Sequence, residues 1–582
     1  MADVPGSFVC NPVDLPYRFQ HIRLPDGTSS VHREGADPSI VRFRDRYFAF
    51  VSMTRGFFHS EDFVHWDYHH TDVLPAFDYA PDARVVDDAL IVTASRMSGT
   101  CPFFRSEDPL QHGFVEVSAG SFAFFDPSLF QDQDGQAYLY WGCSPVEPIY
   151  ATRVHRTTFE PIGERIAVLG ADIDAHGWEV PGDAPEPQTE EERAIFELIG
   201  GRPFIEGAWM TYHDGTYHLQ YAAPQTESHL YADGIYTAPT ALGPFTYSPH
   251  SPYSSKPAGF INGAGHGSTF QDEYGNWWHA STMRISVNHN FERRVGLFPA
   301  GFDADGVLFC NQNFADYPMR IPQGPAETQL NESPEWMLLS YRADASASSS
   351  QPHHEPALAA NEDIRSWWVA GSAEPGQWLT LDLGAEYAVS AVHINMADHE
   401  LSDLAPERTD GELTMAGHRA IDPGSHPVQL RVDVSQDAHR WSTISDGVPK
   451  DSAHQLIVLD EPRTARYVRV TAETPMPFGA PLALSGVRVF GRGFGTPPDP
   501  VTPTIHRDGP TTVRLEWPAR PAATGYNIRY GIEPDKLYHS WLVYDQTDVN
   551  LHTLNSGHRY WFAVDAFNTN GVAPGPITAE GP

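Results

Sequence analysis

Alternating apolar and polar residues run through most of the chain and predict short β-strands joined by turns. The clearest case is the stretch 204–221, in which Trp209 lies on one strand and aromatic and leucine residues alternate along 217–221. The pair Asp214-Gly215 separates the two runs, and Asp-Gly in this position is the strongest short signal for a β-hairpin. Glu206 is therefore expected at the entrance of a hairpin, three residues before an aromatic side chain.

The same arrangement recurs five times within the first 320 residues. Each copy has a short polar or acidic opening, a strand, a turn containing Asp or Gly, and an aromatic-rich strand. A strand-built repeat of this length predicts a β-propeller with one copy per blade. Because the innermost strands of a propeller converge on its axis, the openings of the copies should meet there. The residues expected at this meeting point are Asp37, Asp126, Glu206 and His266.

The whole chain is expected to be all-β, with the propeller followed by two β-sandwiches. Residues 1–325 carry the repeats and 326–340 form a connector. Alternating strands joined by long loops predict a sandwich over 341–492. A Gly/Pro-rich linker at 493–500 leads to a unit of short strands at 501–582, in which Leu554 and Tyr560 are spaced as in the tyrosine corner of immunoglobulin-like sandwiches.

The segment 172–202 interrupts the repeats just before Glu206. It is rich in Asp, Glu, Gly and Pro and then shows a short helical pattern at 190–199. An insertion at this point would lie at the rim of a central pocket and shape access to it. An ordinary surface loop is an equally good interpretation.

Charge and composition narrow the partners. The formal net charge is −37, which repels phosphate backbones, so we expect no nucleic acid partner and a neutral ligand. Aromatic residues make up 12% of the chain, a share that suits stacking on flat ligands such as sugar rings.

The cysteines and the hydropathy of the chain bear on the cellular compartment of the protein. The four cysteines (Cys10, Cys101, Cys143 and Cys310) form no CxxC pair, which disfavours a zinc or redox site and leaves disulfide pairing open. Neither a secretion signal nor a membrane-spanning run is evident in the sequence. We expect a cytoplasmic protein, although a secreted one without its leader would look the same.

Several ordered phrases in residues 1–325 resemble glycoside hydrolase family 43, whose members are five-bladed β-propellers. These phrases are Ala36-Asp-Pro-Ser-Ile, Tyr79-Ala-Pro-Asp82, Asp126-Pro-Ser-Leu-Phe, Glu206-Gly-Ala-Trp, Gly265-His-Gly-Ser and Arg294-Val-Gly-Leu-Phe-Pro-Ala-Gly-Phe-Asp303. Through Ala345-Ser-Ala-Ser-Ser-Ser, Trp378-Leu-Thr-Leu-Asp-Leu-Gly and Arg466-Tyr-Val-Arg-Val, the 341–492 unit resembles a discoidin (coagulation factor 5/8 type C) domain. The 501–582 unit resembles fibronectin type III.

The resemblance implies an inverting hydrolase with Asp37 as general base, Glu206 as general acid and Asp126 as the pKa modulator that orients the acid. Inverting hydrolysis needs one protonated and one ionised carboxyl on opposite faces of the sugar, roughly 6.5–9.5 Å apart. A third carboxylate nearby disfavours a second negative charge, which helps the acid to hold its proton. For a single Asp-Pro-Ser sequence, a turn or cap is the commoner explanation.

The remaining candidates have a structural alternative each. Phe58, Tyr79 and Trp209 would form an apolar wall for the sugar, or would belong to the blade cores. Arg294 would bind sugar hydroxyls, or would pair with the pocket acids. His266 would sit beside a structural calcium or similar ion, as the resemblance implies, or would be a hydrogen-bonded core histidine; calcium prefers several oxygen ligands.

These expectations describe an exo-acting enzyme that releases pentose or furanose sugars from neutral oligo- or polysaccharides without a cofactor for the chemistry. α-L-Arabinofuranosidase and β-xylosidase rank nearly level, with β-D-galactofuranosidase behind. The alternatives are a non-catalytic carbohydrate-binding protein and a retaining fructan-type hydrolase. The discoidin-like unit either contacts glycan or packs against the propeller.

Overall fold

The computed structural model describes residues 7–24, 27–74, 79–181, 201–326, 333–414 and 417–581. Strands dominate these ranges, and the helical elements described are short 3-10 turns: η1 (Gly177–Glu179), η2 (Pro356–Ala360), η3 (Leu401–Asp403) and η4 (Pro477–Gly479). The all-β prediction is confirmed. Among the described residues, the helices are too short to cross a membrane.

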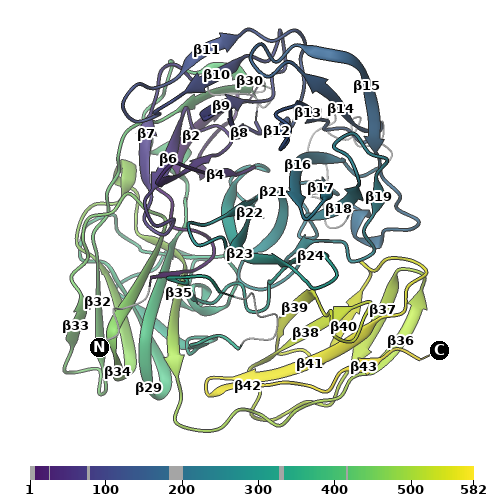
Figure 1. Ribbon diagram of the computed structural model, residues 1–582. Helices are drawn as coiled ribbons and strands as arrows, with labels where there is room; N and C mark the ends of the chain where they lie inside the picture. The colour runs from purple at the N-terminus through teal and green to yellow at the C-terminus, as the bar shows by residue number, and fades with distance from the viewer. Residues whose placement is uncertain are drawn as a thin grey trace.

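Five successive sheets form a ring around a central axis (Figure 1). In each sheet, the first four strands are antiparallel neighbours in chain order, and β20 of the fourth sheet pairs with β18. The first strand of each sheet contacts the first strand of the next, and the fifth contacts the first, so the ring closes. The first sheet contains β4 (Ser39–Phe43), β5 (Arg46–Phe50), β6 (Gly56–Ser60) and β7 (Asp67–His70), and the second contains β8 (Asp82–Val86), β9 (Ala89–Thr93), β10 (Phe103–Ser106) and β11 (Val115–Ser118). The third contains β12 (Ser128–Gln131), β13 (Ala137–Trp141), β14 (Ile149–Val154) and β15 (Pro161–Leu169), and the fourth contains β16 (Glu206–His213), β17 (Thr216–Ala223), β18 (Ala232–Ala238), β19 (Thr246–Tyr247) and β20 (Ser254–Ser255). The fifth contains β21 (Asn262–Gln271), β22 (Trp277–Arg284), β23 (Arg293–Phe302) and β24 (Leu308–Cys310).

The hairpin predicted around Asp214-Gly215 is present. Strands β16 and β17 pair with Tyr212 opposite Tyr217, and the turn residues Asp214 and Gly215 have φ of 44° and 84°. Two successive positive φ values are what a two-residue hairpin turn needs, and Asp-Gly adopts them at low cost. The pairing of β1 (Phe8–Val9) with β25 (Met319–Arg320) joins the two ends of this part of the chain.

The next unit is a sandwich built on two very long strands, β29 (Trp378–Met396) and β34 (His454–Ala472). The strand order is β26-β35-β29-β34-β32-β33, with β27 on β29 and β28 on β35. Its core is rich in buried Val, Leu and Ile side chains. The other strands are β26 (Met337–Leu338), β27 (Asp344–Ala347), β28 (Trp368–Val369), β32 (Leu430–Ser435), β33 (Ser442–Ser445) and β35 (Ala483–Arg492).

The C-terminal unit has two sheets, β36-β37-β40 and β39-β38-β41-β42, with β43 on β41. Its strands are β36 (Thr504–Gly509), β37 (Thr512–Glu516), β38 (Gly525–Gly531), β39 (His539–Tyr544), β40 (Asp548–Leu551), β41 (Trp561–Asn568), β42 (Gly571–Ala573) and β43 (Thr578–Ala579). The Tyr560 hydroxyl accepts a hydrogen bond from the backbone N–H of Asn555 at 2.9 Å, as a tyrosine corner requires. The fibronectin type III assignment stays a prediction.

The described part of the 172–202 insertion packs against the C-terminal unit. The backbone N–H of Gly177 donates to the Leu554 carbonyl at 3.0 Å, and that of Ser556 donates to the Ala175 carbonyl at 2.8 Å. This part of the insertion therefore joins the ring to the C-terminal sandwich. The helical stretch expected at 190–199 lies outside the described residues.

One sheet is shared between the ring and the middle unit (Figure 1). It has the order β3-β2-β31-β30, in which β2 (Arg18–Arg23) and β3 (Ser29–Glu34) precede the first blade. The strands β30 (Glu412–Thr414) and β31 (Gly417–Ile421) belong to a long excursion of the middle unit between β29 and β32. The register places Ile22 opposite Arg419.

Buried ion pairs reinforce this junction. The Arg33 guanidinium lies 2.5 Å from Asp398 of the middle unit, and the Arg33 backbone N–H donates to the same carboxylate at 2.8 Å. Both side chains are almost fully buried. Removing either partner of such a pair is costly, because the other charge would remain buried without a counter-charge.

Replacing Asp398 with Ala should lower the free energy of unfolding by about 3–5 kcal/mol, because Arg33 would remain buried without its counter-charge. Urea denaturation of the full chain measures this change. The matched control is Glu407→Ala, which removes the exposed partner of Arg23 across the same junction. The control should stay within about 0.5 kcal/mol of wild type. Equal losses in the two variants would contradict the assignment of this role to Asp398.

Candidate active site

The openings of four blades meet at one end of the axis, as the repeats predict. Asp37 and Asp126 directly precede β4 and β12 with one proline between, Glu206 begins β16, and His266 lies within β21. His266 Nδ1 is 3.4 Å from Asp37 Oδ1 and 3.7 Å from Asp126 Oδ2. Ligand-type atoms of Asp126, Glu206 and His266 all lie within 4.8 Å of one another.

Three of these residues adopt the left-handed backbone conformation. The φ angles are 50° for Asp37, 50° for Asp126 and 46° for His266. Such conformations cost about 1–3 kcal/mol each and cluster at functional sites. Each strained peptide N–H donates to a side chain from elsewhere: Asp37 to Thr282 Oγ1 (2.8 Å), Asp126 to Ser95 Oγ (2.8 Å) and His266 to Asp233 Oδ1 (2.7 Å). These bonds fix the direction in which the three side chains point.

Donors and a cation surround the Asp37 carboxylate. The Ser52 hydroxyl donates to Oδ2 at 2.5 Å, the Thr282 hydroxyl donates to Oδ1 at 3.3 Å, and Arg293 Nη1 lies 3.5 Å from Oδ1. These groups stabilise a negative charge on Asp37. The sequence analysis missed Ser52. The signal that could have identified it is that Ser52 and Ser95 each lie two residues beyond the second strand of a blade.

Two neutral donors hold Glu206. The Tyr231 hydroxyl donates to Oε1 at 2.5 Å, and the Cys143 thiol lies 3.0 Å from Oε2. Burial raises the pKa of the Tyr231 hydroxyl and of the Cys143 thiol well above their usual values, and nearby carboxylates add to both shifts. Both groups therefore stay neutral and orient Glu206 without adding charge. Like the other three cysteines, Cys143 forms no disulfide.

The Asp126 carboxyl shares its surroundings with other acids. Burial raises the pKa of Asp126 to about 7; His266 opposes this shift, and the carboxylates of Glu206 and Asp37 add to it. Burial lowers the pKa of His266, but Asp37, Asp126 and Glu206 outweigh burial and raise it overall. The acids around His266 therefore hold a proton close to neutral pH, and that proton belongs to the group and not to one residue.

The donor set suits a proton better than a resident calcium ion. Calcium takes six to eight oxygen ligands, whereas the cluster offers one imidazole and the carboxylates of Asp126 and Glu206. One of these carboxyls would have to stay ionised on the metal and could not hold a proton. The ion expected beside His266 stays a prediction.

Of the residues expected to bind sugar, Tyr79 lies beside the acidic cluster and Arg294 faces away from it. Tyr79 lies beside the site, with the Arg293 guanidinium 5.3 Å from its ring centroid. The expectation for Arg294 is wrong: it is 1% exposed, and its guanidinium donates to the Arg33 carbonyl and to His454. Adjacent residues of a strand face opposite sides, so Arg293 faces the acids and Arg294 faces the middle unit.

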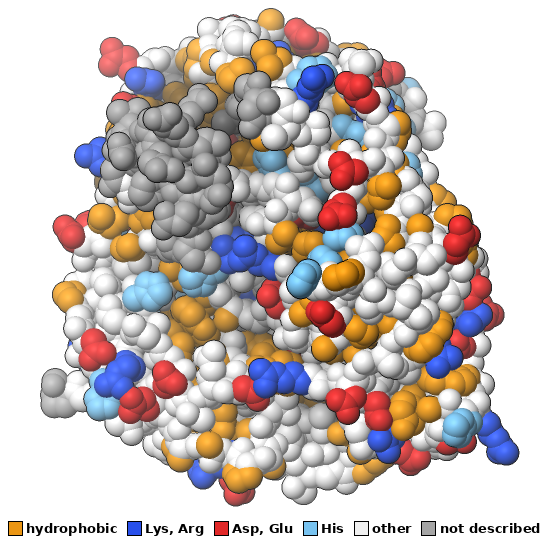
Figure 2. All heavy atoms as spheres, turned by 180° about the vertical axis from the view of Figure 1, so that it is seen from behind, with side chains coloured by type: hydrophobic (Ala, Val, Ile, Leu, Met, Phe, Trp, Pro, Cys, Tyr) orange, Lys and Arg blue, Asp and Glu red, His pale blue; other side chains and the backbone are white. Residues whose placement is uncertain are grey.

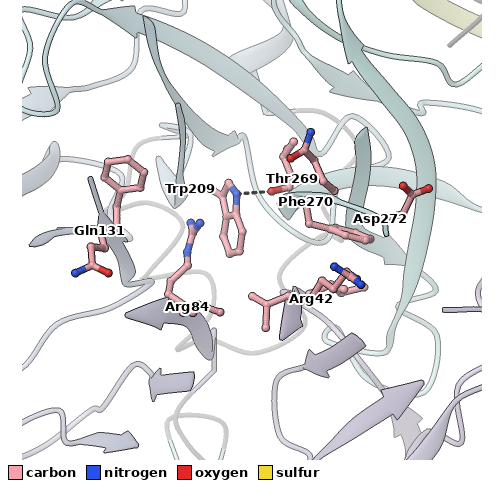
Figure 3. A pocket seen from close by; sticks show the side chains of 12 residues that line it. Arg42, Arg84, Gln131, Trp209, Thr269, Phe270 and Asp272 are labelled. Atoms are coloured by element: carbon pink, nitrogen blue, oxygen red, sulfur yellow. Dashed lines mark hydrogen bonds between the residues drawn. The ribbon is translucent and has the colours of Figure 1, made fainter. Parts of the chain in front are cut away.

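The expectations for Phe58 and Trp209 are also wrong. Phe58 is fully buried in a core that the first and fifth blades share. Trp209 faces a cavity of about 420 Å³ that is lined by later residues of the first strands, and hence lies at the other end of the axis from the acids. Figure 3 shows Arg84 next to Trp209, whose indole N–H donates to the Thr269 carbonyl at 3.0 Å. The Arg84 guanidinium covers the ring 3.2 Å from its centroid.

Two models of known protein families match parts of this chain. The model of glycosyl hydrolases family 43 matches residues 30–308, which include all four axial residues. Residues 30–308 belong to glycoside hydrolase family 43. The prediction of this family from the ordered phrases is confirmed. The model described as a NedA-like, galactose-binding domain matches residues 358–470, in agreement with the discoidin-like prediction for the middle unit.

The individual relatives of this chain are distant. A β-xylosidase of Xylanibacter ruminicola is 26% identical over 157 residues, which cover 25% of this chain and 44% of that protein. The chain thus spans under half the length of this curated relative. A solved thermostable family 43 glycoside hydrolase is 21% identical, with a TM-score of 0.41 and coverage of 55% of this chain and all of that one. A xylan β-1,4-xylosidase of Bacillus halodurans is 14% identical, with a TM-score of 0.40 and coverage of 98% and 96%.

The raised pKa of Asp126 gives a stability prediction. A folded-state pKa of about 7 against 3.8 means that the folded protein binds this proton more tightly than the unfolded chain does. The resulting stabilisation is present at low pH and is lost as the pH rises from about 4 to about 7. Asp126→Asn stays neutral, so it should melt above wild type at pH 8 and approach wild type near pH 4.

Thermal unfolding over this pH range measures the effect. The control is Asp45→Asn, at an exposed turn of the first blade, which should follow wild type at every pH. A melting temperature for Asp126→Asn that stays below wild type at pH 8 would show that Asp126 is stabilised as a carboxylate.

Proposed function

We propose that this chain is an inverting, exo-acting glycosidase that removes terminal pentose sugars from neutral oligo- or polysaccharides. The convergence of Asp37, Asp126 and Glu206 around His266 carries this proposal. Family 43 membership supports the reaction class. The interspersed acidic and basic side chains on the face in Figure 2 and the net charge of −37 suit a neutral substrate.

In the proposed reaction, Asp37 acts as general base on a water molecule. Its carboxylate accepts hydrogen bonds from Ser52 and Thr282 and faces Arg293, so it is held in one orientation beside a cation. Water attacks the anomeric carbon from the side opposite the leaving group, and Asp37 takes its proton.

Glu206 acts as general acid in the same step. It delivers a proton to the glycosidic oxygen as the bond breaks, while Tyr231 and Cys143 hold its carboxyl in place. The nearby Asp126 disfavours a second negative charge and so keeps the proton available to Glu206. His266, between Asp37 and Asp126, supplies compensating positive charge.

Among pentosides and furanosides, we place β-xylosides first because the curated relative is a β-xylosidase. α-L-Arabinofuranosides and β-D-galactofuranosides are the next candidates. Relative kcat/KM on aryl β-D-xyloside, α-L-arabinofuranoside and β-D-galactofuranoside decides the sugar, and cleavage of sucrose or levan would favour the fructan-type alternative. Hydrolysis of any aryl glycoside contradicts a purely carbohydrate-binding role.

Glu206→Gln should separate substrates by leaving group. With an aryl pentoside that needs protonation, kcat should fall on the order of 10²- to 10⁴-fold, because general acid catalysis is lost. A dinitrophenyl pentoside leaves without a proton, so its hydrolysis should fall far less. The control is Glu164→Gln on the exposed strand β15, which should behave as wild type. Equal losses on both substrates would argue against Glu206 as the acid.

The stereochemistry of the product tests the single displacement. Proton NMR during the first minutes of hydrolysis should show the free sugar with inverted anomeric configuration before mutarotation. Asp37→Ala should remove turnover, because no other base is proposed for the water. A sugar that first appears with retained configuration would require a covalent intermediate and would end the direct-displacement proposal.

A further inference from the structure

The shared sheet brings one charged side chain of the middle unit to the edge of the active site. Strand β31 pairs with β2, and Arg419 in this strand is 2% exposed as a residue, with a fully buried side chain. Its Nη1 donates to Glu34 Oε2 at 2.8 Å, and its Nη2 donates to the Tyr79 hydroxyl at 2.6 Å. Ile421 of the same strand packs in a small apolar cluster with Met53 and Tyr79.

Glu34 links Arg419 to the arginine that faces the proposed base. Glu34 Oε1 accepts a hydrogen bond from Arg293 Nη2 at 2.7 Å, and Arg293 Nη1 lies 3.5 Å from Asp37 Oδ1. The side chains therefore alternate in charge: Arg419, Glu34, Arg293, Asp37. We call these four residues the relay.

Each carboxylate of the relay depends on the cations on either side. Burial raises the pKa of Glu34, but Arg419 and then Arg293 outweigh burial and hold it well below its usual range. Without Arg419, the single Arg293 guanidinium would have to serve two buried carboxylates. It would be drawn towards Glu34, which is already the closer of the two.

Other titratable groups face the relay from the surrounding elements. They are His32, His289, Tyr79, Tyr231, His266, Asp126 and Glu206. Burial and the nearby His32 and Arg419 hold the pKa of His289 far below its usual value, at about 3, so His289 adds no positive charge at neutral pH. Arg419 thus supplies a charge that His289 does not.

We propose that Arg419, contributed by the discoidin-like unit, is a positioning residue of the glycosidase site that keeps Arg293 on Asp37 and fixes Tyr79 beside it. This inference rests on the proposed function, because it assigns a role within the same reaction. Arg419 acts through Glu34 and Tyr79 and not by touching the reacting atoms. The middle unit then has a part in hydrolysis that is separate from any glycan binding of its own.

The test is the pH dependence of kcat/KM for Arg419→Met in the full chain. If Arg293 moves away from Asp37, the base binds its proton more tightly, so the acidic limb of the profile should move to higher pH. The displaced site should also lower kcat/KM on the order of 10- to 100-fold at the optimum. Arg419→Lys retains the charge next to Glu34, so its acidic limb should return towards that of wild type.

Arg18→Met is the matched control. Arg18 is also a buried arginine of this junction. Its backbone lies opposite Glu34 in the pairing of β2 with β3, but its guanidinium bonds Asp451 and the Gly424 carbonyl of the middle unit and not a relay side chain. Its loss should weaken the junction and leave the pH profile in place. An unmoved profile in folded Arg419→Met, or an equal shift in Arg18→Met, would overturn the inference.

A second variant and the turnover of the wild-type enzyme complete the test. Should Arg419→Met fail to fold, Tyr79→Phe removes only the hydroxyl that accepts from Arg419. Unchanged kcat and KM in Tyr79→Phe would then overturn the inference. Absence of turnover in wild type on all pentosides would contradict the proposed function itself. Turnover in wild type with an unmoved Arg419→Met profile would contradict this inference alone.

Discussion

Negative charge buried on the axis is the constraint on which the rest of this structure depends. Three acidic side chains converge where water is largely excluded, and isolated charges are costly in such surroundings. Two basic side chains lie among these acids: His266 between Asp37 and Asp126, and Arg293 beside Asp37. Compensation stays incomplete at Asp126, whose pKa of about 7 leaves a proton in the cluster. In the proposed mechanism, this proton serves acid catalysis.

The compensation does not end at the boundary of the ring. Arg293 shares Glu34 with Arg419, and the nearby Arg33 and Arg294 both turn towards Asp398 of the middle unit. Interfaces between units of one chain are usually modest and allow relative motion. Here a continuous sheet and several buried ion pairs cross the interface, so we expect less relative motion around the site than such interfaces usually allow.

The sequence predicted the axial residues well because a propeller turns sequence repeats into spatial neighbours. Asp37, Asp126, Glu206 and His266 occupy equivalent places in their repeats, so their meeting follows from the repeat alone. Side-chain direction was harder to predict. Arg293 and Arg294 are adjacent on one strand, and a shift of one residue exchanges the two faces. Phe58 and Trp209 failed similarly, because an aromatic on a blade strand fits a core as well as a pocket. Arg419 carried no local signal, since it is 385 positions from Glu34.

The pairing of β31 with β2 also has a consequence for the order of synthesis. Residues 18–34 leave the ribosome early, whereas residues 417–421 appear only after the entire ring has been translated. Until then the nascent ring has an unpaired strand edge at β2, and Glu34 has one arginine partner in place of two. The ring therefore emerges with the end that holds the acidic cluster unfinished, and the gene segments for the two units cannot be recombined independently without leaving that edge exposed.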